Sequence, residues 1–292
     1  MSHYLQMKYV FCISLFSLLI SPSLGGFAKE KKVKIQWYTY SLQPYHIEND
    51  PQFANQGIGD SILEIWKNQL QHFDHTPLNV NIPRMLSILA SPRFDGCVVG
   101  TFITPSIKKN LYWTEQIYVE TPPMIVLKKQ LWKQLQSPKE LSVSTLLSNS
   151  KLRFGRIKGR GLGPAVDAIL KKAKGQPNIF MLSSKEATRS LVSMVKMDRM
   201  DWGIIFPTEL AWILRDNLPN TDLITVPITE HKAGTPVHAG CAKNIMGKSI
   251  VLRLNKSLKD KKNLDAIRKS FELWLPDERS KEVFHDLNSF EY

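Results

Sequence analysis

Apolar residues along the first half of the chain alternate between short runs and helical stripes. Residues 33–40, VKIQWYTY, combine β-branched and aromatic side chains and predict a strand. Apolar positions then recur at helical spacing from Ile58 to Leu70. The segments that follow are LNVNI, a strand, PRMLSILA, a helix with proline in its first turn, and DGCVVGTF, a strand apolar enough to be buried on both faces.

The second half of the chain repeats this alternation. Strands are predicted for PPMIVLKKQ, KLRFGRI, MDWGIIFP, DLITVPI and VHAGCAKN, and helices for AVDAILKKA, KEATRSLVSMVKM and ELAWILRDN. A polar loop separates the first two of these helices, and two amphipathic helices follow the last strand. Strands that alternate with helices predict an α/β fold built on mostly parallel sheets.

The simplest architecture for this pattern has two lobes. We expect lobe 1 to comprise residues 29–123 and 230–292, and lobe 2 to be the inserted segment 124–229, because a proline-containing connection stands at each boundary. Ligands in such folds bind at the carboxyl ends of the strands. The loops after Tyr38, Gly100, Ile157 and Ile205 should therefore surround one cleft.

The first 28 residues have the layout of a secretory signal peptide. Lys8 precedes the apolar run YVFCISLFSLLI, and small residues follow in SPSLGGFA. The run is too short to span a bilayer comfortably. We therefore expect residues 1–28 to be removed and the protein to reach the periplasm. The cleavage position, and whether Met1 or Met7 is the start, stay open.

Charge and cysteine content add two expectations. The formal net charge of +13 favours anionic partners, and outside the cytoplasm these are lipid headgroups, cell-wall polymer or an acidic ligand rather than nucleic acid; a simply solvated basic surface is the alternative. Cys97 and Cys241 lie in strands assigned to lobe 1, so we expect them in neighbouring strands. An oxidising compartment permits a disulfide, but the sequence leaves two free thiols equally open.

Several segments together resemble the bacterial extracellular solute-binding proteins of family 3, the periplasmic receptors best known for amino acids. The resemblance covers nearly the whole mature chain, as a divergent branch. It is carried by IQWYTYSLQPY, NIPRMLSIL, FDGCVVGTFITPSIKKNLYWTEQIY, GRIKGRGLGPAVDAIL and MVKMDRMDWGIIFP. It implies a two-lobe periplasmic-binding-protein fold of type II, with the ligand cleft between the lobes.

The departures from the family pattern concern the ligand. Family members grip an amino-acid carboxylate with an arginine in the turn after Gly100, and an aspartate in lobe 2 takes the ammonium. Those places correspond here to Ile107 and Phe206. Losing the arginine removes a charge-assisted pair, and losing the aspartate leaves a desolvated ammonium without a partner. The resemblance therefore implies a solute other than a plain α-amino acid.

The candidate ligand-binding residues come from both lobes. They are Trp37, Tyr40, Tyr45, Arg84, Phe102, Thr104, Arg160, Phe206 and Glu209. Aromatic faces suit rings, sugars, apolar groups or cations, although about half of a strand's side chains point into the core. The glycine-rich turn Gly159–Gly163 before Pro164 predicts an anion seat that Arg160 would reinforce; a tight turn with solvated basic side chains is the alternative. Together these features predict a ligand with a flat or apolar part and an acidic part.

The leading hypothesis is a non-enzymatic solute-binding protein that closes on a small molecule for an ABC-type importer or a sensor. The sequence has no recognisable catalytic motif. His72 and His75 have a spacing that could hold a metal, but no third ligand is evident near them, so we expect no cofactor and no bound metal. We also expect a monomer. The alternatives are a scaffold that binds a protein or cell-wall fragment and, with less support, a periplasmic enzyme on the same fold.

Overall fold

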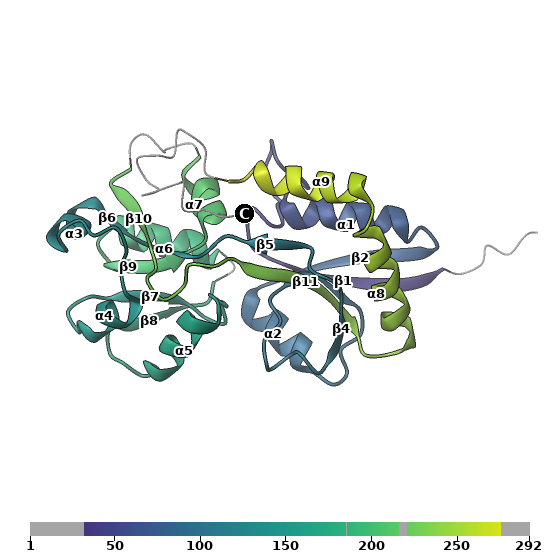
Figure 1. Ribbon diagram of the computed structural model, residues 1–292, viewed down its shortest axis with the longest axis horizontal. Coiled ribbons are helices and arrows are strands. Elements are labelled where there is room, and N and C mark those ends of the chain that lie inside the picture. The colour runs from purple at the N-terminus through teal and green to yellow at the C-terminus, as the bar shows by residue number, and fades with distance from the viewer. Residues whose placement is uncertain (1–31, 185, 216–220, 276–292) are drawn as a thin grey trace, which may run out of the picture. The chain divides into compact units, whose positions relative to one another are not determined.

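The computed structural model describes residues 32–184, 186–215 and 221–275, and the predicted signal peptide lies outside these ranges. The described chain forms two mixed sheets, each flanked by helices (Figure 1). No helix within these ranges is long and apolar enough to cross a membrane.

The first sheet has six strands in the order β2-β1-β3-β11-β4, with β5 paired to β11. Its strands are β1 (Val33–Tyr40), β2 (Phe73–Val80), β3 (Cys97–Thr101), β4 (Leu111–Trp113), β5 (Tyr118–Glu120) and β11 (Thr235–Ala242). β1 runs parallel to β2 and β3, whereas β11 is antiparallel to β3, β4 and β5. One strand from late in the chain therefore holds three earlier strands together.

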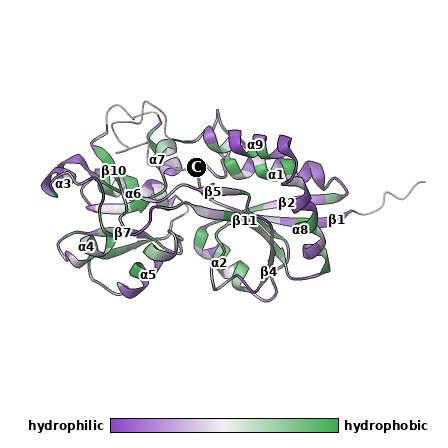
Figure 2. Ribbon diagram, viewed as in Figure 1, coloured by the Kyte–Doolittle hydropathy of each residue, from purple (hydrophilic) through white to green (hydrophobic). Residues whose placement is uncertain are grey.

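Alternating side chains bury both faces of the first sheet. Cys97 and Val99 join the core beneath α1 (Ile58–Gln69), α8 (Ile245–Ser257) and α9 (Lys261–Glu272), while Val98 joins a smaller core beneath α2 (Ile82–Ala90). Apolar and polar stripes along α1 and α9 are visible in Figure 2. This is the period-two pattern expected of a strand covered on both sides.

The second sheet has five strands in the order β10-β6-β9-β7-β8. These strands are β6 (Met124–Lys128), β7 (Phe154–Ile157), β8 (Ile179–Leu182), β9 (Trp202–Ile205) and β10 (Leu223–Pro227). The flanking helices are α3 (Lys129–Gln134), α4 (Val143–Ser148), α5 (Pro164–Lys172), α6 (Ala187–Lys196) and α7 (Pro207–Leu214). Val126 packs with α6 and α7, whereas Ile125 and Leu127 pack with α4 and α5. All strands of this sheet come from one continuous stretch of chain.

The structure confirms the two-lobe α/β architecture and refines its details. The sheets are mixed rather than mostly parallel, because β6, β10 and β11 pair antiparallel with their neighbours. The sequence did not predict β4, β5, α3 or α4, all of which are short. It also assigned a polar loop where β8 lies. β8 is an edge strand that pairs only with β7 and leaves Phe180 and Met181 exposed, so it lacks the pattern of a buried strand.

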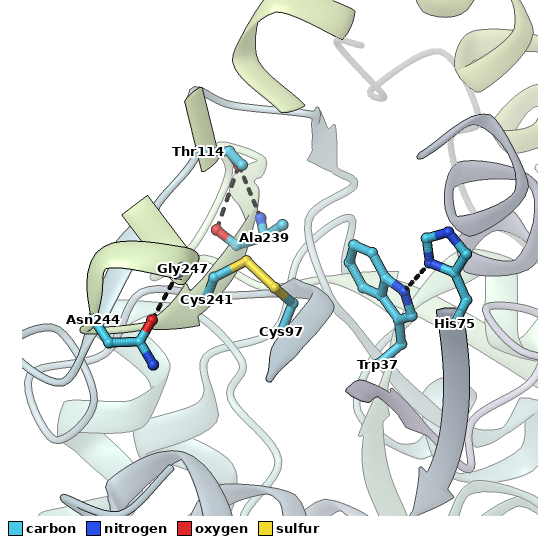
Figure 3. Close-up of a disulfide and its surroundings, with 8 residues drawn as sticks. All are labelled: Trp37, His75, Cys97, Thr114, Ala239, Cys241, Asn244 and Gly247. Carbon is cyan, nitrogen blue, oxygen red and sulfur yellow. Dashed lines mark hydrogen bonds between the residues drawn. A yellow bond between two sulfur atoms is a disulfide. The ribbon is translucent and has the colours of Figure 1, made fainter. Parts of the chain in front are cut away.

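A disulfide joins Cys97 and Cys241 across the β3–β11 pair, which confirms that they lie in neighbouring strands (Figure 3). Their Cα atoms are 4.0 Å apart, and 144 positions separate them in the sequence. Both side chains are fully buried. Beside them, Thr114 Oγ1 donates to the Ala239 carbonyl and accepts from the Ala239 N–H (Figure 3). β11 is thus tied to β3 covalently and to the residue after β4 by side-chain hydrogen bonds.

Candidate functional site

A cavity of about 300 Å³ is lined by residues of both sheets. Its lining comes mainly from the segment after β1, the end of β3 and the turn that follows, the end of β5, and the turn after β7. The predicted loops after Tyr38, Gly100 and Ile157 therefore do surround one cavity. The loop after Ile205 approaches it through Glu209, which pairs with the lining residue Arg160.

Aromatic side chains dominate the part of the cavity formed by the first sheet. We call Tyr40, Tyr45, Phe102, Tyr118 and Glu120 the first-sheet wall. The hydroxyls of Tyr40 and Thr101 are 2.8 Å apart and share a hydrogen bond. Burial raises the pKa of Tyr40 to about 12 and raises that of Tyr45 well above its usual value. Both phenols therefore stay neutral at physiological pH and can donate hydrogen bonds.

Glu120 is the acidic member of the first-sheet wall and is only 2% exposed. It accepts hydrogen bonds from the Tyr45 hydroxyl and from both the N–H and the hydroxyl of Thr121. Burial raises the pKa of Glu120 to about 7; the Glu209 carboxylate adds to the rise, while the Tyr45 hydrogen bond and Arg160 oppose it. Glu120 was not among the predicted site residues. The only feature of the sequence that pointed to it was its position as a carboxylate at the end of an apolar, aromatic segment.

Arg160 and Glu209 form a buried ion pair next to the cavity. The guanidinium Nη2 donates to Glu209 Oε1, and the side chains are 11% and 1% exposed. Arg160 also lies over the ring of Phe206, 4.7 Å from its centroid. From its sequence position Glu209 could point inward to a donor, although such a residue more often completes the first turn of a helix; in the structure it contacts Arg160 and also accepts from the N–H of Phe206. Arg160 is therefore already engaged by a carboxylate of the protein.

The glycine-rich turn before α5 also contains its own acid. The Asp167 carboxylate accepts a hydrogen bond from the N–H of Leu162, 3.1 Å away, at the start of the helix. Burial raises the pKa of Asp167, and Arg156, which also lines the cavity, opposes that rise. We call Arg156, Gly159, Arg160, Gly161 and Asp167 the second-sheet wall. Carboxylates of the protein thus partly offset the positive charge of its arginines and of its helix start. This weakens the case for an anion-binding site at this turn.

Five of the nine predicted residues line the cavity directly, namely Tyr40, Tyr45, Phe102, Thr104 and Arg160. Glu209 and Phe206 lie behind the lining: Phe206 is fully buried and its ring centroid is 6.0 Å from that of Phe102.

The prediction was wrong for two site residues, Trp37 and Arg84, because neither lines the cavity. Trp37 is fully buried in the core beneath α1, where its indole N–H donates to His75 Nδ1 at 2.9 Å (Figure 3). Strand alternation turns Trp37 away from the face that carries Tyr40. Arg84 is an exposed residue of α2.

Ile107, which the sequence resemblance aligns with the ligand-gripping arginine of family 3, does not line the cavity either. It is fully buried in the core beneath α2. The carbonyl of Thr104 accepts from the N–H groups of both Ile107 and Lys108, so the chain turns tightly here and carries Ile107 inward. The neighbouring Thr104 and Ser106 line the cavity instead.

His46 is a further lining residue that the sequence analysis missed. Its Nδ1 lies 2.8 Å from Asp60 Oδ1, and Asp60 also accepts from the N–H groups of Ile47 and Gly57. Throughout the described ranges, no three His, Cys, Asp or Glu side chains gather in a way that could hold a metal ion.

No protein-family model matches the sequence, and no curated protein sequence matches it. Solved structures do. An ancestral arginine-binding protein bound to arginine shares 17% identity with a TM-score of 0.62, covering 84% of this chain and 99% of that one. The chain has the type II periplasmic-binding fold. A protein of glutathione import from Streptococcus mutans also matches, at 12% identity and a TM-score of 0.63, covering 86% of this chain and 100% of that one.

A third neighbour with this periplasmic-binding fold is an arginine-specific periplasmic binding protein of Salmonella typhimurium, at 14% identity and a TM-score of 0.60, covering 84% of this chain and 100% of that one. An ancestral amino-acid-binding protein described as a precursor of cyclohexadienyl dehydratase also matches, at 15% identity and a TM-score of 0.60, covering 83% and 95%. The identities establish a shared fold. The cavity in this chain is lined from both sheets of that fold.

Proposed function

We propose that this protein is an exported solute-binding protein that closes on a small molecule and presents it to a membrane importer or a sensor. One observation carries the proposal: in a type II periplasmic-binding fold, a cavity of about 300 Å³ is lined by residues of both sheets. Pockets of this size and mixed apolar and polar lining are typical of small-molecule sites. We further propose that residues 29–123 with 230–292, and residues 124–229, act as the two lobes.

We also propose that the solute is not a plain α-amino acid. The residue in place of the family's arginine, Ile107, is buried in a core. Phe206, in place of the aspartate, packs behind the cavity. Arg160, the nearest substitute for a carboxylate grip, is held by Glu209. A zwitterion would therefore lose the paired contacts that offset the desolvation of its two charges.

A thermal-shift screen of the mature protein tests this function. The panel should contain amino acids, organic cations, organic anions, sugars and short peptides. A ligand at about 100 times its Kd stabilises the folded state by about 2.7 kcal/mol, which raises the melting temperature measurably. We expect a hit outside the plain amino acids. A panel in which no compound binds would contradict the solute-binding function, and tight binding of an ordinary amino acid would contradict only its narrower form.

Lobe closure separates a solute receptor from a scaffold that binds a protein or cell-wall fragment. We expect small-angle X-ray scattering to show a smaller radius of gyration when a hit from the screen is added. A scaffold would instead bind a macromolecular partner without compaction. The same data show whether the protein is a monomer in solution.

One observation favours a second candidate function, a periplasmic enzyme. Glu120 lines the cavity, and its pKa of about 7 is suited to general acid–base catalysis at neutral pH. The fold is shared with the ancestral precursor of a dehydratase. Incubating each screening hit with the protein and following it by NMR distinguishes the two functions, because a receptor returns its ligand unchanged.

A further inference from the structure

Two buried carboxylates at the cavity, Glu120 and Glu209, share the electrostatic influence of one guanidinium, that of Arg160. Arg160 pairs with Glu209. The Arg156 guanidinium acts electrostatically on Asp167, and His46 hydrogen-bonds Asp60. Glu120 makes no ion pair with a basic side chain in the described part of the chain, and the Arg160 guanidinium that acts on it electrostatically is hydrogen-bonded to Glu209 instead. Its direct partners are the hydroxyls of Tyr45 and Thr121 and one backbone N–H.

The surroundings of Glu120 suit a positive charge. The carboxylate lies on the same wall as Tyr40, Tyr45 and Tyr118, and aromatic faces attract ammonium and guanidinium groups. Tyr45 is itself held in place, because its hydroxyl lies 3.1 Å from Thr208 Oγ1 while it donates to Glu120. A buried carboxylate without an ion-pair partner of its own is costly, and a cation in the cavity would relieve that cost.

We propose that the solute is a compact organic cation whose ammonium or guanidinium group binds against Glu120 and the tyrosines of the first-sheet wall. This inference rests on the proposed solute-binding function and names the class of ligand. The cation would supply the missing charge partner, and the aromatic rings would pack against its apolar part. Of the two arginines in the described lining, Arg160 is engaged by Glu209 and Arg156 donates to the Leu170 carbonyl, so a ligand carboxylate would have to compete with partners within the protein.

Cation binding at this place should be coupled to a proton. Four ionisable groups act on Glu120. They are Tyr45 in the segment after β1, Tyr118 in the same strand as Glu120, Glu209 in α7 and Arg160 in the turn after β7. Its pKa of about 7 means that close to neutral pH a share of the molecules carry the proton. A bound cation stabilises the ionised carboxylate, so binding should expel that proton and strengthen as the pH rises.

The test compares cations with uncharged analogues of similar shape. The pairs are choline with 3,3-dimethylbutan-1-ol, putrescine with 1,4-butanediol, and agmatine with (4-hydroxybutyl)urea. Calorimetry at about pH 8 should show at least one cation binding about tenfold or more tightly than its analogue, equivalent to about 1.4 kcal/mol. Glu120→Gln keeps the shape and the hydrogen-bond acceptor, and should abolish that preference. Glu64→Gln, on the exposed face of α1, is the matched control and should retain it.

Proton release provides a second measurement that needs no variant. Titrating a binding cation near pH 7 in buffers of different ionisation enthalpy should reveal release of a fraction of a proton from the parent protein, and none from Glu120→Gln. Equal affinity for cations and their analogues, preference for anions in the wider screen, or an unchanged cation preference in Glu120→Gln would overturn the inference. If anions or neutral compounds bind while cations do not, solute binding stands and only the ligand class fails.

Discussion

The two walls of the cavity differ in how their charged side chains are paired. On the second-sheet wall, Arg160 has a buried carboxylate partner, and Arg156 and Asp167 lie within each other's electrostatic influence. On the first-sheet wall, the one carboxylate, Glu120, is surrounded by hydroxyl groups. Charges that are already paired contribute little net attraction to a ligand, whereas an unpaired one can be stabilised by it. The comparison indicates that the second-sheet wall is structural and the first-sheet wall selective.

The largest expected effect tests the structural role of the second-sheet wall. Arg160→Ala should lower the free energy of unfolding by about 3–5 kcal/mol, because it strips Glu209 of its charge partner at a position that is 1% exposed. Urea denaturation measures the loss. The double variant Arg160→Met with Glu209→Leu is the control and should recover most of it, since no buried charge remains. Near-parental stability of Arg160→Ala would show that the pair is dispensable, and the walls would then not differ as described.

The second-largest expected effect concerns the disulfide. The sheet that carries the first-sheet wall contains the Cys97–Cys241 disulfide, and the described part of the second sheet has none. Replacing both cysteines with alanine should cost about 2–5 kcal/mol. Hydrogen exchange should show the greatest loss of protection in β3 and β11 and a smaller loss in β6 and β9. Equal loss in both sheets would mean that the two lobes unfold as one unit.

The third prediction uses pH to isolate Glu120. In the folded state Glu120 keeps its proton up to about pH 7, whereas its ordinary value is 4.5. The folded state therefore binds more protons between these values, and the stability that this provides below about pH 4.5 is lost as the pH rises through about 7. Relative to the parent, Glu120→Gln should become more stable by up to about 3 kcal/mol over this window.

Chemical denaturation at several pH values measures the difference between parent and Glu120→Gln. Glu64→Gln is again the control, and its difference from the parent should change little with pH, because Glu64 is an exposed residue of α1. A constant difference for Glu120→Gln would show that Glu120 ionises normally, and the contrast between the walls would lose its main support.

The smallest expected effect concerns Ile107. Ile107→Val should lower the free energy of unfolding by about 0.5–1.5 kcal/mol, because it shortens a fully buried side chain. It should leave solute affinity unchanged, since Ile107 belongs to the core beneath α2. Ile204→Val, at a buried position of β9, is a matched substitution with a similar expected cost. Weaker solute binding by Ile107→Val would place this turn among the ligand contacts.

Sequence patterns predicted the elements whose periodicity is set by burial. Residues 33–40 form β1 as expected, and the helical spacing from Ile58 to Leu70 corresponds to α1. Short or edge elements carry no such pattern, which is why β5 and β8 were missed. The cysteine pair was placed correctly in neighbouring strands because both residues lie in buried strands of the same lobe.

The site was predicted less well, because its chemistry depends on contacts between distant segments. The sequence identified Arg160 and Glu209 separately, but not that they neutralise each other across 49 positions. The resemblance to family 3 placed Ile107 at the position of the ligand-gripping arginine, whereas the turn at Thr104 directs its side chain into the core. Glu120 is buried by residues such as Tyr45, 75 positions away. No local pattern reports such an environment.

The position of β11 in the first sheet has a consequence for the order in which the protein is made. β11 is synthesised after every described strand of the second sheet, yet it pairs with β3, β4 and β5. As the chain emerges, residues 124–227 can complete their sheet locally, while the strands around them wait for the last one. Until then the edges of β3 and β5 that pair with β11 lack their partner. Binding competence thus arrives last, when β11 closes the sheet that carries Glu120.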